Sequence, residues 1–148
     1  MTRVVFHCDN TAATREHPFG YPRHVSTDNK ECVHRFVFPT VLVCTDLYET
    51  EKISEPDSCI IHHQGLNKFI NISELVRPQP YIVTVPGLFD ETNHYEIEPC
   101  GKLVSSCGGA VCHVSKTVKE SLGHLTSMIY DENLDAIKVD YKEVTKCL

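Results

Sequence analysis

The stretch YEIEPCGKLVSSCGGAVCHVSKTVKESLGHL, residues 95–125, holds three of the eight cysteines in this chain. A short strand pattern ends at Cys100, a polar loop contains Cys107, and a Gly-Gly turn leads into a second strand with Cys112. Cysteines at strand ends, rather than along one helix face, are typical of disulfides that tie a sheet together. The stretch predicts a disulfide-linked β-fold from an oxidising compartment.

The composition predicts a folded chain with its own hydrophobic core. At 148 residues the chain can bury a substantial core, so disulfides would add to it rather than replace it. There is no Cys-x-x-Cys pair, and no histidine pair follows a cysteine pair at zinc-finger spacing. Zinc ribbons and thioredoxin-like domains therefore lack their signatures here. The triplet Asn71-Ile72-Ser73 is an N-glycosylation sequon, which fits a lumenal glycoprotein.

The charge pattern argues against nucleic-acid and membrane partners. The formal net charge is -6, and the lysines are scattered rather than gathered in a basic patch. The longest nearly apolar run, Phe36–Cys44, is broken by a proline and is too short to span a membrane. The opening residues MTRVVFHC resemble a strand rather than a signal peptide, so we expect a secretory parent protein to be represented here by a fragment.

Alternating apolar residues predict short strands along most of the chain. In Cys32–Cys44, His34, Phe36 and Phe38 share one side of a half-buried strand, whereas residues 9–31 have the composition of a long ordered loop. A helical period occurs only at 118–125. The predicted fold is all-β, a disulfide-stapled flattened β-barrel or sandwich. The other predicted strands are Arg3–Cys8, Cys59–Ile61, Lys68–Leu75, Pro80–Val85, Ser127–Tyr130 and Ala136–Tyr141.

Several blocks resemble mannose 6-phosphate receptor homology domains. Cys32-x-His34-x-Phe36-x-Phe38-x-Thr40-x-x-x-Cys44 resembles their closing signature, Cys-x-Tyr-x-Phe-x-Trp-x-Thr-x-Ala-Cys. The cysteine spacing is more specific than the individual side chains. The other similar blocks are Val4–Cys8, Asn71–Leu75, Tyr95–Cys100, Ala110–Ser115 and Leu122–Gly123.

The order of these blocks implies parts of two repeats. The closing block comes first, so the resemblance makes residues 1–45 the end of one repeat and 59–148 the first two-thirds of the next, as in a multi-repeat receptor. The acidic residues 46–58 would link them, although an acidic surface loop inside one domain has the same composition. A bolder hypothesis is that both parts dock as one circularly permuted domain.

The family pattern also implies a set of disulfides. It would join Cys8 to Cys44, Cys59 to Cys100 and Cys107 to Cys112. In a permuted domain the two remaining cysteines, Cys32 and Cys147, would bond to each other. The alternative is a truncated fragment with two free thiols and an exposed sheet edge.

The resemblance implies a degenerate carbohydrate site. Sugar-binding members contact mannose through a Gln, an Arg, a Glu and a Tyr. Here His113 stands at the Gln position, His34 at the Tyr position and Glu31 at the Glu position, and the Arg has no counterpart. The two histidines form either a pair that charges in an acidic endosome or two partly exposed replacements without a role. The adjacent pair His62-His63 is expected at the surface, with its side chains on opposite faces of a strand.

These features together predict a non-catalytic, lectin-like module without cofactor or metal. Cys112-His113 is not a catalytic pair, because neighbouring side chains on a strand diverge. The expected parent is a lysosomal-enzyme sorting receptor of the Golgi, endosome, lysosome or cell surface. The expected partners are glycoproteins or proteins such as lysosomal hydrolases, together with neighbouring repeats. Two alternatives stay open: an extracellular module that binds a protein or growth factor, and an intracellular zinc-binding domain.

Overall fold

Strands make up most of the structure. A computed structural model of the protein describes residues 1–28, 30–50, 59–84, 93–100 and 107–142. Within these ranges there is no α-helix, and three short 3-10 helices follow strands: η1 (Val41–Val43), η2 (Thr45–Leu47) and η3 (Ser73–Leu75). The strands are β1 (Thr2–Cys8), β2 (Arg23–Asp28), β3 (Val33–Thr40), β4 (Ile60–His63), β5 (Lys68–Asn71), β6 (Tyr81–Thr84), β7 (His94–Ile97), β8 (Val111–Val114), β9 (Lys119–Asp131) and β10 (Ala136–Lys142).

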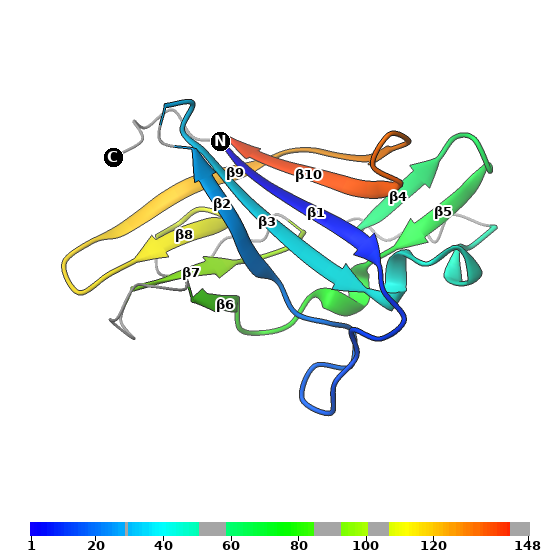
Figure 1. Cartoon of the computed structure of the whole chain (residues 1–148), viewed down its shortest axis with the longest axis horizontal. Coiled ribbons are helices and arrows are strands. Elements are labelled where there is room, and N and C mark those ends of the chain that lie inside the picture. The colour runs from blue at the N-terminus through cyan, green and yellow to red at the C-terminus, as the bar shows by residue number, and fades with distance from the viewer. Residues whose placement is uncertain (29, 51–58, 85–92, 101–106, 143–148) are drawn as a thin grey trace.

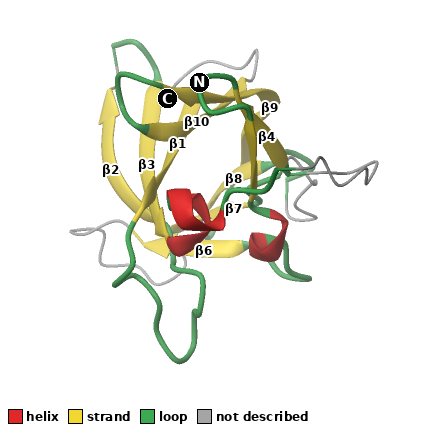
Figure 2. Cartoon of the chain, turned by 90° about the vertical axis from the view of Figure 1, so that its right-hand side faces the viewer, coloured by secondary structure: helices red, strands yellow, loops and turns green. Residues whose placement is uncertain are grey.

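Eight of these strands form one strongly curved sheet. Their order is β2-β3-β1-β10-β9-β8-β7-β6, and β4 pairs with β5 in a separate hairpin that contacts β9. The sheet curls until its two edge strands, β2 and β6, contact each other, so the strands surround the interior as a nearly closed barrel (Figures 1 and 2). The predicted all-β barrel-like fold is confirmed.

Apolar side chains at alternate positions fill the interior. In β1, Val4 and Phe6 are fully buried, and in β3 Phe36 and Phe38 are buried beside them. The Phe6 and Phe38 rings stack with their centroids 5.0 Å apart. Tyr141 of β10 is also fully buried, and its hydroxyl donates to the backbone carbonyl groups of residues 98 and 99. The two-residue period of the strands therefore determines which side chains form the core.

The N-terminal segment and the segment that begins at residue 59 share the large sheet. β1 runs parallel to β3 on one side and antiparallel to β10 on the other, with Val4 opposite Phe36 and Val139. The two segments therefore bury a common core. Their origin in two successive repeats stays a prediction, and residues 51–58 of the acidic segment lie outside the described residues.

Disulfides connect segments that the sheet brings together. Cys8 bonds to Cys44, Cys59 to Cys100, and Cys107 to Cys112, which are the pairs that the family resemblance implies. Cys32 is also disulfide-bonded, and its expected partner, Cys147, lies outside the described residues. The alternative with a free thiol at Cys32 is therefore wrong.

The structure corrects the prediction of an uninterrupted loop at 9–31. Residues Arg23–Asp28 form β2, which pairs antiparallel with β3. A β-bulge between His24 and Ser26 shifts the register, so the exposed Val25 adds an outward residue. The bulge breaks the alternation on which sequence-based detection of a strand depends.

Two other predicted elements differ from the structure. The helical period predicted at 118–125 coincides, from residue 119 on, with the thirteen-residue strand β9, because pairing with β8 on one side and β10 on the other outweighs local preference. The strand predicted at Lys68–Leu75 ends at Asn71. There the Asn71 side-chain oxygen accepts the backbone N–H of Ser73 (2.9 Å), which turns the chain into η3.

Gly123 of β9 provides a test of the close approach between β9 and β10. Its φ is +150°, and a Cβ atom would lie 2.7 Å from the carbonyl carbon of Tyr141. We expect Gly123→Ala to lower the free energy of unfolding by about 3 kcal/mol or more. The matched control is Gly108→Ala, where φ is +76° but no described atom lies within 4 Å of the new Cβ. The control should lose only about 1 kcal/mol in denaturant unfolding; equal losses would contradict the assignment.

Candidate functional site

Three half-buried histidines surround the buried ring of Tyr95. Tyr95 comes from β7, His24 from β2, His34 from β3 and His113 from β8. The ring of His24 lies parallel to that of Tyr95, with 5.6 Å between the centroids. The corresponding centroid distances are 5.9 Å for His34 and 5.2 Å for His113. We call these four residues the histidine cluster.

Strand register places each member of the cluster. On one side, His24 lies opposite Phe36, and Thr27 lies opposite His34, across the β2–β3 pair. On the other side, Tyr95 lies opposite His113 across the β7–β8 pair. The curvature of the sheet turns these two pairs toward each other, and Phe36 meets Tyr95 edge to face at 5.1 Å. The cluster therefore depends on the barrel and not on any local segment.

Hydrogen bonds fix the imidazole rings. The Thr27 hydroxyl oxygen lies 2.8 Å from Nε2 of His24 and 3.3 Å from Nδ1 of His34. A hydroxyl has one proton, so it donates to one of these nitrogens and accepts from the other, which couples the two tautomers. The Nε2 atom of His113 lies 2.6 Å from the amide oxygen of Asn93, an arrangement in which the imidazole donates.

Partial burial lowers the pKa of two of the imidazoles. Desolvation, with positive charge at the amino terminus, His24 and His113, lowers the pKa of His34 to about 4. Desolvation also lowers the pKa of His24 and raises the pKa of the Tyr95 phenol. Each proton that enters the cluster opposes the next one, because like charges repel at short range.

The structure brings together two of the three predicted sugar-site residues. His34 and His113 both contact Tyr95, whereas Glu31 is exposed in the turn before β3, where its backbone N–H donates to the Asp28 carboxylate (3.2 Å). The sequence analysis did not single out His24. A sequence signal for His24 does exist: if Val25 is left out of the count, His24 and Thr27 fall on the same face of β2. The bulge at Val25 conceals this pattern.

The His62-His63 pair is only partly as predicted. The two side chains do point to opposite faces, with His62 exposed, but His63 is buried rather than at the surface. Its Nδ1 atom accepts the backbone N–H of Leu66 (3.1 Å), and its ring lies 4.0 Å from that of Tyr130. The β4–β5 hairpin packs on β9, which covers His63.

The described residues contain neither a metal site nor a membrane-spanning helix. Among the described residues, no group of three or more His, Cys, Asp or Glu side chains is placed to hold a metal ion. The described part of the chain also contains no helix long and apolar enough to cross a membrane.

Comparison with known proteins identifies one family. The family model described as cation-independent mannose-6-phosphate receptor repeat matches residues 1–148, the whole chain. A search of curated proteins found no match.

The lowered pKa of His34 predicts that acid destabilises the fold. Between pH 6.5 and about 4 the unfolded chain binds a proton that the folded chain does not, so the free energy of unfolding falls as the pH falls through this window. We expect a loss on the order of 2 kcal/mol in denaturant unfolding, which is less than the full pKa shift would give because His34 is partly exposed and solvent screens its charge. His34→Phe should flatten this part of the profile, and His62→Gln, at an exposed histidine, should not. Superimposable profiles for His34→Phe and the unmodified chain would refute this assignment.

Proposed function

The chain belongs to the family of cation-independent mannose-6-phosphate receptor repeats, and from this premise we propose that it is a non-catalytic lumenal module of a receptor of that kind, without a working sugar site. The family is one of receptor modules rather than enzymes. The disulfides of this chain fit an extracellular or lumenal domain. The proposed setting is a lysosomal-enzyme sorting receptor of the Golgi, endosomes or lysosomes, or of the cell surface.

The histidine cluster is the observation that carries this proposal. His34 and His113 stand where the resemblance implies sugar-binding Tyr and Gln, and their rings pack against Tyr95. A phosphorylated sugar requires cationic and planar donors that are open to the ligand. The Arg that would supply a cation has no counterpart in this chain, and the partly buried His24 and His34 have a pKa lowered by desolvation, so they carry little charge at pH 7. This supports a module that acts as a spacer or binds protein.

The proposed lack of a sugar site can be tested by titration calorimetry with mannose 6-phosphate. We expect no saturable heat, which corresponds to a dissociation constant weaker than about 1 mM. Mannose without the phosphate is the control for weak heats of mixing. Saturable binding of mannose 6-phosphate that His34→Phe abolishes would show that the cluster is a working sugar site and would contradict the proposal.

The sequon at Asn71 supports a secretory setting. The Asn71 side-chain oxygen accepts hydrogen bonds from the N–H and hydroxyl of Ser73, at 2.9 and 2.6 Å. The two residues therefore form a compact turn at the end of β5, in which Asn71 is half-buried, Ser73 is exposed and Ile72 between them is fully buried. The amide nitrogen of Asn71 is the atom that an N-linked glycan would modify.

Glycosylation at Asn71 has a direct readout. When the chain is expressed through a eukaryotic secretory pathway, we expect a glycan whose mass is lost on treatment with a peptide N-glycosidase. Asn71→Gln should remove it. Asn67→Gln, a few residues away and outside any sequon, should keep it. An unmodified secreted chain would contradict the glycoprotein prediction.

A further inference from the structure

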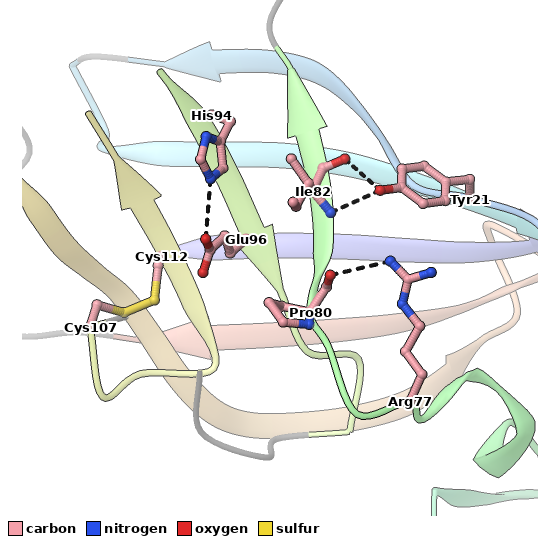
Figure 3. A network of polar contacts seen from close by, with 8 residues as sticks. All are labelled: Tyr21, Arg77, Pro80, Ile82, His94, Glu96, Cys107 and Cys112. Carbon is pink, nitrogen blue, oxygen red and sulfur yellow. Dashed lines mark hydrogen bonds and ion pairs between the residues drawn. A yellow bond between two sulfur atoms is a disulfide. The ribbon is translucent and has the colours of Figure 1, made fainter. Parts of the chain in front are cut away.

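The segment Arg77-Pro78-Gln79-Pro80, between η3 and β6, fixes one edge of an arginine side chain. Its two prolines restrict the backbone, and each removes an N–H group that would otherwise compete for the carbonyl oxygens. The Arg77 side chain folds back onto its own segment (Figure 3). Its Nε donates to the carbonyl oxygen of Gln79 (3.1 Å) and its Nη2 to that of Pro80 (3.2 Å). The edge of the guanidinium that joins Nε and Nη2 is therefore occupied.

Two tyrosine rings hold the same guanidinium in place. The guanidinium carbon of Arg77 lies 3.9 Å from the ring centroid of Tyr81 and 5.6 Å from that of Tyr21. The two rings meet edge to face at 5.4 Å. Tyr21 is itself fixed, because its hydroxyl donates to the Ile82 carbonyl oxygen (2.7 Å) and accepts the Ile82 N–H (2.9 Å). The conformational entropy of the Arg77 side chain is thus restricted before any ligand binds.

The other edge of the Arg77 guanidinium keeps its hydrogen-bond donors. A guanidinium has more N–H groups than the two bonds to backbone carbonyls use. Those on Nη1, and the second one on Nη2, have no partner among the described residues. The ion pairs in the described part of the chain involve Arg3, His94 and Lys138, and none involves Arg77. Arg77 is therefore a rigid cation without a counter-ion, and its free edge presents a pair of parallel donors.

This cation lines a cavity with apolar neighbours. Arg77, Pro78 and Gln79 line a space of about 270 Å³. That volume is below the usual range for drug-sized ligands but can hold one side chain. Two large apolar residues beside this segment are exposed, Val76 by 40% and Ile82 by 48%. An ordered arginine with tyrosines and exposed apolar residues is typical of the residues that contribute most to protein–protein binding. The features together indicate an interaction surface.

We propose that the Arg77 cavity binds the carboxylate of an acidic side chain on a partner protein, whose apolar neighbours pack on Val76 and Ile82. The parallel N–H groups of an arginine edge match the two oxygens of a carboxylate. Charge favours this ligand, because one guanidinium balances one carboxylate, whereas a phosphate group carries about −1.5 to −2 at pH 7. The cavity is separate from the histidine cluster, so the inference does not depend on whether that cluster binds a sugar.

The test is an NMR titration of the oxidised, nitrogen-15-labelled chain at constant ionic strength. The probe is the peptide acetyl-Leu-Glu-Leu-amide, and the signals followed are the Arg77 side-chain Nε–H and the Gln79 backbone amide. We expect both signals to shift and to saturate. The same peptide with glutamine in place of glutamate is the neutral control, and it should bind at least about tenfold more weakly. Inorganic phosphate should also bind Arg77 more weakly than the glutamate peptide.

Two arginine variants complete the test. Arg77→Lys keeps the charge but removes the parallel donors, so the dissociation constant of the glutamate peptide should rise at least about tenfold. The matched control is Arg35→Lys on β3, which β2 separates from β6, and it should bind as the unmodified chain does. Three results would overturn the proposal: equal binding of the glutamine peptide, tighter binding of phosphate, or shifts at Arg35 as large as those at Arg77. All three can be measured on the unmodified chain, without a variant that must fold.

Discussion

The pairing of β1 with both β3 and β10 is the constraint on which the rest of the structure depends. Thr2, Val4 and Phe6 alternate inward from β1, and their neighbours on both sides come from opposite ends of the chain. Burial of these residues joins an N-terminal segment and a C-terminal segment in one core. Without this central strand the sheet would divide into two smaller sheets, each with an exposed apolar face.

The same pairing creates the histidine cluster. His34 lies on β3 beside β1, whereas His113 and Tyr95 lie at the far side of the sheet on β8 and β7. Only a sheet curled into a barrel brings these strands face to face, and the half-buried imidazole rings then pack against the buried ring of Tyr95. The low pKa of His34 is a consequence of that packing, so the acid sensitivity of the fold and the geometry of the cluster have one cause.

The two edge strands of the nearly closed barrel, β2 and β6, contact each other without forming a strand pair in the described sheet. Instead of a neighbouring strand, the Tyr21 hydroxyl bonds to the backbone N–H and C=O groups of Ile82 in β6. A phenol provides both a donor and an acceptor on a rigid ring, so it satisfies an edge without extending the sheet. Side-chain capping of this kind lets an open barrel keep a hydrophobic strand at its edge.

The all-β class, most strand positions and the family could be predicted from the amino-acid sequence, together with the disulfide framework that the family pattern implies. The strands follow from the residue period, which is a property of neighbouring residues, whereas the disulfide pairs follow from the resemblance to the family. The sequence also pointed to His34 and His113, but it missed β2 and His24 because a bulge interrupts the alternation. The exposed position of Glu31, the burial of His63 and the contact of Tyr21 with β6 became known from the three-dimensional structure. The last two depend on contacts between residues far apart in the chain, which local patterns do not encode.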